Sequence, residues 1–309
     1  MEAGPDGAVN ARPTPPSGIL FVDKPAGITS HGVVARVRRA LGTRKVGHAG
    51  TLDPMATGLL IVGVGSATRL LTWLVGASKT YEAVIRLGAG SSTDDAEGEL
   101  GPAASPTLLA DVTDAQISSG VQALTGEIMQ RPSSVSAIKV DGKRSYTRVR
   151  EGEDVVLEAR PVTVSRFEVT SIERPAGAID LTAVIDCSSG TYIRALARDL
   201  GDALGVGGHL TALRRTRVGP YALGPAVALD ADLLSALVTP AAAAAALFPT
   251  VELGAAEAVD LAHGKRVSVE HPDAGPVGAV SPEGRLVGLV EVTAGVARVL
   301  VNFPTDEVS

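Results

Sequence analysis

Hydrophobic and polar positions follow two different periods along the first sixty residues, and each period predicts a different element. Residues 18–23 (GILFVD) form a short apolar run that ends in Lys-Pro-Ala-Gly, which predicts a strand closed by a turn. In residues 30–42, valine and leucine recur every three or four positions, which predicts an amphipathic helix with a basic outer face and Ser30 as its N-cap. Residues 47–58 are rich in turn formers, so we expect a loop there before the next apolar strand, residues 59–65.

The same two periods continue through the rest of the chain. The mixture of alternating and helical patterns predicts the α+β class. Beyond residue 251, short apolar runs are punctuated by Gly and Pro, which predicts a small β-rich domain. We expect further strands at 80–87, 161–173 and 178–187, and helices at 113–125 and 191–205.

Segments of unusual composition suggest how the chain is divided. The first 17 residues contain acids and no apolar run, so they are not a signal peptide and are expected to be a disordered leader. Residues 231–250 are rich in alanine and interrupted by Pro240 and Pro249, which favours a connector over a membrane span. We therefore expect a main domain at 18–230, with a polar, basic excursion at 130–152, and a C-terminal domain at 251–309.

The cysteine content bears on the redox compartment of the protein, and the distribution of charge bears on the kind of partner that it binds. The single cysteine, Cys187, permits no internal disulfide, which favours a reduced, cytoplasmic environment and a buried thiol. The net charge is −6, yet residues 24–52 carry six cations and no acid, and residues 131–150 carry six cations and one acid. Residues 221–309 are acidic, with eleven acids and four cations. The basic blocks are either solvated faces or a surface for a polyanion such as a nucleic acid.

Several classes of chemistry have no support in the sequence. The chain contains no G-x-x-x-x-G-K-[ST], no H-E-x-x-H and no G-x-S-x-G, so P-loop, zincin and α/β-hydrolase chemistry are not indicated. The GVGSAT segment lacks the third glycine of a dinucleotide fingerprint. The acids in residues 94–99 are read as a solvated loop, with cation binding as the alternative.

The segment GHAGTLDPMATGLL, residues 47–60, holds the most informative carboxylate. Asp53 has no acidic neighbour with which to share a proton or hold a metal. From the residues alone, an Asx-turn carboxylate before Pro54 is favoured over a catalytic group.

A resemblance to a known family favours the catalytic interpretation of Asp53. Residues 47–60 resemble the catalytic motif of the bacterial tRNA pseudouridine-55 synthases, the TruB family. Residues 187–201 (CSSGTYIRALARDLG) are similar to the family segment whose arginine contacts the catalytic aspartate. Further matches occur in the family's order over residues 18–223, namely DKPAGITSH, KTYEAVIRLG, RPSSVSAIKVDGKRSYTRVREG and HLTALRRTRVG.

The resemblance implies a fold and an activity. It implies a mixed, mainly antiparallel sheet domain followed by a PUA-like C-terminal domain. It also implies cofactor-free and metal-free isomerisation of uridine 55, in the T-loop of tRNA, to pseudouridine by a cytoplasmic protein, which we expect to be a monomer. The C-terminal sixty residues match in pattern only, and their acidity favours a bracing role over RNA contact.

The resemblance also assigns catalytic roles. Asp53 matches the nucleophile, and Arg194 matches the arginine that orients it through a forked guanidinium. Tyr81 matches the tyrosine that stacks on the target base and could accept a sugar proton, although core packing would explain a strand tyrosine as well. Attack at C1′, attack at C6 and removal of a C2′ proton all remain open as the chemical route.

Other positions are assigned to substrate binding. His48 matches the histidine that fills the space left by flipped bases, and with only His31 nearby it is not a metal ligand. For Leu213, core packing is the alternative to lining the uridine pocket, which Tyr192 is also expected to line. The cations expected to contact phosphates are Lys24, Arg36, Arg38, Arg39, Lys139, Lys143 and Arg144, the last three on a thumb-like excursion.

A rival function uses the same surface without chemistry. A tRNA chaperone that binds and remodels the tRNA elbow needs shape and charge but no nucleophile. Asp53 separates the two functions, because replacing its carboxylate should abolish isomerisation and leave chaperone activity intact.

Overall fold

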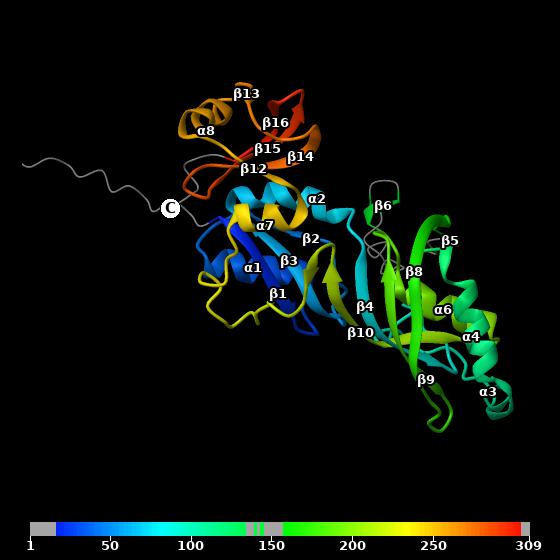
Figure 1. Ribbon diagram of the computed structural model, residues 1–309. Helices are drawn as coiled ribbons and strands as arrows, with labels where there is room; N and C mark the ends of the chain where they lie inside the picture. The colour runs from blue at the N-terminus through cyan, green and yellow to red at the C-terminus, as the bar shows by residue number, and fades with distance from the viewer. Residues whose placement is uncertain (1–16, 134–138, 141–142, 145–156, 304–309) are drawn as a thin grey trace, which may run out of the picture.

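The computed structural model describes residues 17–133, 139–140, 143–144 and 157–303, and its strands form two main sheets (Figure 1). The larger sheet has the order β1-β3-β10-β4-β9-β8-β5, with β2 on β3 and β11 on β10. Its pairs are antiparallel except for β10 with β3, so the predicted mixed, mainly antiparallel sheet is confirmed. Its strands are β1 (Gly18–Lys24), β2 (Val46–Ala49), β3 (Thr57–Val64), β4 (Lys79–Leu87), β5 (Gly126–Gln130), β8 (Arg160–Glu173), β9 (Ile179–Cys187), β10 (Gly208–Val218) and β11 (Tyr221–Ala222).

At β1 and β3 the larger sheet is covered on both faces, which explains the uninterrupted apolar runs of these two strands. In β1, Leu20 and Val22 pack into one hydrophobic cluster, whereas Ile19 and Phe21 pack into another on the opposite face, because neighbouring side chains point in opposite directions. The helical segments of this part are α1 (Ser30–Ala40), the 3₁₀ helix η1 (Gly65–Leu70), α2 (Leu71–Val75), α3 (Pro106–Asp111), α4 (Asp114–Ala123) and α6 (Ile193–Ala203).

The start of α1 differs from the sequence-based expectation by one residue. Thr29, not Ser30, is the N-cap, and its side chain accepts a hydrogen bond of 2.9 Å from the Gly32 amide. Ser30 is buried instead, and its hydroxyl bonds to the backbone of Leu52. Either of two adjacent hydroxyl residues can cap a helix. Here Ser30 is bonded to Leu52, so Thr29 is the residue that caps α1.

The C-terminal lobe has its own five-stranded sheet in the order β12-β14-β15-β16-β13. It meets the larger part through α7 and η1, and it lies above α7 and α2 in Figure 1. Arg69 of η1 donates a hydrogen bond to the Asn302 carbonyl, and Trp73 packs edge-on against Phe248. The helix between the two parts is α7 (Pro240–Leu247). The elements of the lobe are β12 (Thr250–Glu252), α8 (Ala255–Ala262), β13 (Val267–Ser268), β14 (Ala274–Val280), β15 (Leu286–Thr293) and β16 (Val296–Asn302).

Two segments complete the description. A small hairpin of β6 (Lys139–Val140) and β7 (Lys143–Arg144) falls in the basic excursion. The chain after β11 returns along the outer edge of β1, where Val238 and Val227 form bridges with Ile19 and Val22. Most of the predicted leader, residues 1–16, lies outside the described residues. Within the described part of the chain, no helix is long and apolar enough to cross a bilayer.

A glycine marks the closest approach of two strands and provides a test of the fold. Gly58 has φ +95°, and a Cβ there would lie 2.3 Å from the Arg215 carbonyl oxygen on the neighbouring strand. We expect Gly58→Ala to lower the free energy of unfolding by at least about 2 kcal/mol. Gly27→Ala, also at positive φ but with open space around it, should cost only about 1 kcal/mol. Urea denaturation of both variants checks this, and equal losses would contradict it.

Candidate active site

The loop that carries Asp53 is held from inside by a buried arginine. Arg215, on β10, is fully buried, and its guanidinium donates hydrogen bonds to backbone carbonyls on both sides of the loop. The acceptors are Leu59 at 2.8 Å, Gly50 at 2.9 Å and Thr51 at 3.4 Å. Because a buried guanidinium must satisfy its N–H groups, these bonds fix the path of the loop between β2 and β3.

Two further buried side chains complete this support. The Ser30 hydroxyl accepts from the Leu52 amide at 2.9 Å and donates to the Leu52 carbonyl at 3.1 Å. The Lys24 ammonium donates to the carbonyls of Ile28, Pro25 and Pro54, at 2.8, 2.9 and 3.2 Å. Elements distant in sequence, β1, α1 and β10, therefore hold the backbone on both sides of Asp53.

The position of Lys24 corrects one expectation. Lys24 was expected to contact RNA phosphates, but its side chain is 0% exposed and all three ammonium protons are used within the protein. Burial lowers the pKa of Lys24 to about 8, and the nearby Asp53 carboxylate opposes the shift. Lys24 is a support of the loop and not a phosphate ligand.

Asp53 and Arg194 form an ion pair although 141 residues separate them. Arg194 Nε donates to Asp53 Oδ2 at 2.9 Å, and Arg194 Nη1 donates to the Thr93 carbonyl at 2.9 Å. The Arg194 side chain is 4% exposed, whereas that of Asp53 is 34% exposed. A buried, fixed cation therefore orients a carboxylate that a substrate can still reach.

The acidic loop after β4 supplies a second carboxylate to the same arginine. Asp95 is buried, and its Oδ2 lies 3.5 Å from Arg194 Nε. Asp94 is also buried and accepts a hydrogen bond of 3.0 Å from Arg198, one helical turn after Arg194. The expected solvated loop is therefore wrong for these two residues, which anchor α6 instead. Glu97 and Glu99 remain exposed.

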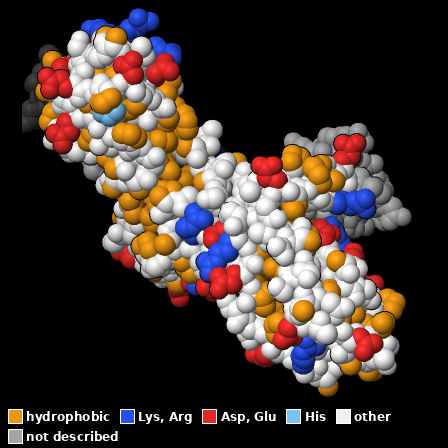
Figure 2. Space-filling model, turned by 45° about the vertical axis from the view of Figure 1, so that its right-hand side comes forward, with side chains coloured by type: hydrophobic (Ala, Val, Ile, Leu, Met, Phe, Trp, Pro, Cys, Tyr) orange, Lys and Arg blue, Asp and Glu red, His pale blue; other side chains and the backbone are white. Residues whose placement is uncertain are grey.

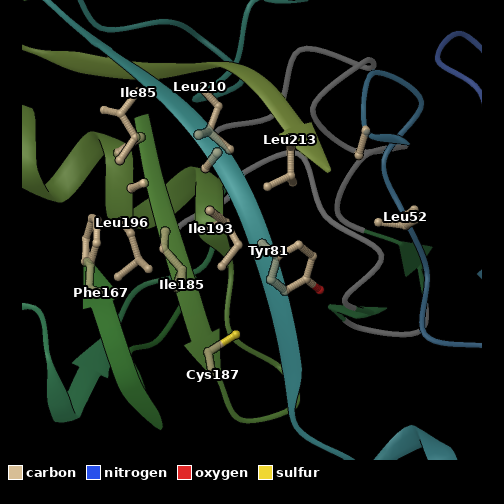
Figure 3. Packing of buried hydrophobic residues seen from close by; sticks show 14 of the residues in the cluster. Leu52, Tyr81, Ile85, Phe167, Ile185, Cys187, Ile193, Leu196, Leu210 and Leu213 are labelled. Carbon is tan, nitrogen blue, oxygen red and sulfur yellow. The ribbon is translucent and has the colours of Figure 1, made fainter. Parts of the chain in front are cut away.

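A cavity of about 390 Å³ opens beside Asp53 and brings together five of the predicted site residues. Tyr81 lies on β4 between Leu213, Ile193 and Cys187, with its hydroxyl turned toward the side of Leu52 (Figure 3). Burial raises the pKa of Tyr81 above its usual 10, so the phenol is protonated at neutral pH. The predicted residues that line the cavity are Asp53, Tyr81, Tyr192, Leu213 and Arg194, and they are joined by Lys79 and Arg215.

The backbone of Tyr192 is held at the cavity wall by one amide side chain. Gln130, at the end of β5, accepts from the Tyr192 amide at 2.8 Å and donates to the Tyr192 carbonyl at 3.0 Å. Gln130 is buried, so this pair of bonds fixes where α6 begins.

The other predicted binding residues lie outside the cavity. His48 lies on β2 with its ring 5.4 Å from that of His31, and neither histidine lines the cavity. Arg36, Arg38 and Arg39 are exposed on α1, as a phosphate-contacting role would require. Lys139, Lys143 and Arg144 lie in the β6–β7 hairpin, where only the backbone is described and their side chains lie outside the described residues.

A larger cavity, about 720 Å³, lies between α8, the β14–β15 turn and Arg69. None of the residues that the sequence predicts for catalysis lines it, so the smaller cavity is the better candidate for the reaction. Among the described residues, no group of three or more His, Cys, Asp or Glu is arranged to hold a metal ion.

Comparison with known proteins assigns the family. The family model described as TruB family pseudouridylate synthase (N terminal domain) matches residues 38–193. Two C-terminal models, of tRNA pseudouridylate synthase B and of tRNA pseudouridine synthase II, match residues 194–249 and 248–304. The chain belongs to the TruB family.

Individual relatives agree over nearly the full length. The tRNA pseudouridine synthase B of Leifsonia xyli is 59% identical, with 95% of this chain and 98% of the relative covered, and that of Thermobifida fusca is 56% identical, with 93% and 98% covered. Among solved structures, a Cbf5-Nop10-Gar1 complex contains a chain with a TM-score of 0.67 at 26% identity, with 93% of this chain and 84% of that chain covered. An H/ACA RNP bound to a substrate RNA gives a TM-score of 0.68 at 25% identity, with 94% and 86% covered. The predicted family and fold class are confirmed.

The pKa of His48 gives a test of the site's electrostatics. Burial, His31 and Arg215 lower the pKa of His48 to about 4. The ring is therefore neutral at pH 7, and the folded protein takes up its proton only near pH 4, below the ordinary value of 6.5. The unfolded chain binds this proton first, so His48 should reduce stability as pH falls from 6.5 toward 4.

NMR titration of the His48 ring measures this pKa directly. A midpoint near 6.5 for His48 would contradict the described burial.

Proposed function

We propose that the protein isomerises uridine to pseudouridine in tRNA, at position 55 of the T-loop. The observation that carries the proposal is the Asp53–Arg194 pair at the edge of a cavity walled by Tyr81 and Leu213. Membership of the TruB family and the names of the relatives support the substrate and the reaction.

Asp53 is the reactive group in this proposal. Its carboxylate is accessible from the cavity and is oriented by Arg194, which is itself fixed by Thr93 and Asp95. Pseudouridine formation breaks the C1′–N1 bond of uridine, turns the base and rejoins it through C5, so no atoms are gained or lost. A single positioned carboxylate can serve each of the three routes, attack at C1′, attack at C6 or removal of a C2′ proton with cation stabilisation.

Tyr81 contributes mainly a surface for the base. An aromatic ring in the cavity wall suits stacking on a flipped uracil. Its raised pKa disfavours a role as a base toward the sugar proton, because a protonated phenol donates a hydrogen bond but cannot accept that proton. We therefore assign Tyr81 to binding and Asp53 to the chemistry.

The target uridine must leave its loop before it can reach the cavity. Flipping costs a few kcal/mol, which phosphate contacts and stacking must recover. Exposed cations on α1 are suited to those contacts, and His48, neutral and next to α1, is suited to occupy the space that the base leaves.

The C-terminal residues are proposed to brace the catalytic part. The face drawn in Figure 2 shows Lys and Arg side chains interspersed with Asp and Glu, and no continuous basic surface. Residues 221–309 are acidic overall, and they contact the rest of the protein through Arg69, which donates to the Asn302 carbonyl, and through Trp73, which packs against Phe248.

Release of tritium from tRNA labelled at uridine C5 tests the reaction. We expect release by the wild type without added cofactor, and a loss of more than about 1000-fold in Asp53→Asn, because the amide is not a nucleophile. RNA affinity should stay within a few-fold.

Two other outcomes would contradict parts of the proposal. Release that maps outside the T-loop would overturn position 55. Tight tRNA binding without release by either protein would replace the enzyme with the chaperone alternative.

Salt dependence tests the proposed phosphate contacts of α1. The double variant Arg36→Ala/Arg39→Ala should weaken tRNA binding and lower the slope of log K against log salt by about 1.5 to 2 units. The control is Arg298→Ala, an exposed arginine of the C-terminal lobe that pairs with Glu291. A slope equal to that of the wild type would remove α1 from the RNA interface.

A further inference from the structure

Three cations line the cavity beside Asp53, and they differ in the ion-pair and hydrogen-bond partners that they have within the protein. Arg194 is paired with Asp53 and Asp95. Arg215 donates to the carbonyls of the catalytic loop. Lys79 lines the same cavity, yet it forms no ion pair with any carboxylate in the described part of the chain. The positive charge of Lys79 therefore has no carboxylate partner among the described residues.

The geometry of Lys79 leaves one donor for a ligand. Its ammonium donates to the Ala77 carbonyl at 2.8 Å and to the Val75 carbonyl at 3.3 Å. An ammonium has three N–H groups, so one remains. Lys79 begins β4 two residues before Tyr81, so both side chains point to the same face of the strand, the face that lines the cavity.

Lys79 is buried, and no carboxylate is among the groups that shift its pKa. The residue is 6% exposed, and Cε lies against Gly50 at the start of the catalytic loop. The titratable and charged groups that act on it are Arg215 on β10 and the Cys187 thiol on β9, while Tyr81 follows on its own strand. Burial and Arg215 lower the pKa of Lys79 to about 8. Keeping an ammonium in such a place is costly and is typical of functional sites.

The proposed reaction produces a negative charge that this cation could meet. When the C1′–N1 bond breaks, its electron pair leaves with the base, and the charge spreads to the carbonyl oxygens of uracil. Attack at C6 also places charge on a carbonyl oxygen, as an enolate. The charge disappears when C5 returns the pair to C1′, and the proton that C5 then loses is balanced by the one that N1 gains.

We propose that Lys79 is a further catalytic residue, whose third N–H donates to a uracil carbonyl oxygen and stabilises the anionic base while it is detached. The proton stays on the lysine throughout, so the residue acts by charge and hydrogen bonding and not by proton transfer. This inference rests on the proposed function and adds a named group to the same cavity.

Single-turnover kinetics on unmodified tRNA test the inference, with Lys79→Met and Lys79→Gln compared with the wild type. We expect the rate of isomerisation to fall by about 100-fold or more in Lys79→Met, as for the loss of one donor to a developing anion, with the tRNA Kd within about threefold. Lys79→Gln keeps a neutral donor and should lose less. Lys265→Met, at an exposed lysine of the C-terminal lobe, is the matched control and should be unchanged.

Two readouts separate this role from a structural one. The wild-type rate should decline as pH rises through about 8, where the ammonium of Lys79 loses its proton, and this decline should be absent in Lys79→Met. The Cys187 thiol, with a pKa raised to about 11, and Tyr81, with a pKa above 10, titrate too high to produce it. With 5-fluorouridine at the target position, C5 has no proton to lose, so cleavage of the C1′–N1 bond is followed in place of isomerisation. Because this base leaves more easily, its cleavage should be slowed less in Lys79→Met than the reaction of uridine is.

The outcomes are distinguishable. If the wild type forms no pseudouridine, the proposed function fails and this inference fails with it. If the wild type is active and Lys79→Met keeps its rate within threefold, only the role of Lys79 is overturned. A decline near pH 8 that persists in Lys79→Met would assign the titration to Lys24 and also overturn it.

Discussion

The candidate site depends on hydrogen bonds from buried side chains to the backbone of the loop that carries Asp53. Arg215, Lys24 and Ser30 come from three elements and together bond to six backbone groups on the loop or at its ends, on residues 50, 51, 52, 54 and 59. A Gly- and Pro-rich loop has little structure of its own, so its shape comes from these partners. Burying two cations is costly unless their N–H groups find acceptors, and here backbone carbonyls of the loop and of residues 25 and 28 accept from them.

The loop and its support fix the direction of Asp53, the carboxylate that we propose as the reactive group. Asp53 faces the cavity, Arg194 lies behind it, and Asp95 and the Thr93 carbonyl lie behind Arg194. Each member limits the movement of the next, which is how a short carboxylate side chain acquires one direction without a rigid element beneath it. Lys79 differs from the other two cations of the cavity, because Arg194 is paired with carboxylates and Arg215 is bonded to three loop carbonyls, whereas Lys79 has no carboxylate partner among the described residues.

Local patterns predicted most of the elements, but not the inward use of charged residues. The alternation in residues 80–87, the helical pattern in residues 113–125 and the long apolar run of β3 all predicted elements that the structure contains. Lys24 and Asp95 were assigned to solvent because a single sequence shows no partner for a buried charge. Arg215 was overlooked within the basic run LRRTRVG, although its spacing of two from Leu213 on a strand indicated a shared face. The side chains of Lys139, Lys143 and Arg144 remain predictions.

The order of strands in the larger sheet has a consequence for how the protein is made. β10 lies between β3 and β4, so among the strands that the structure describes it alone joins β1 and β3 to the β4-β9-β8-β5 half of the sheet. It is also among the last strands of that sheet along the chain, and it brings both Arg215 and Leu213. The cavity needs Leu213 and Arg215, so we expect it to be complete only after residue 218 has left the ribosome. Contacts between residues so far apart in sequence form slowly, so we expect the two halves of the sheet to be joined late in folding.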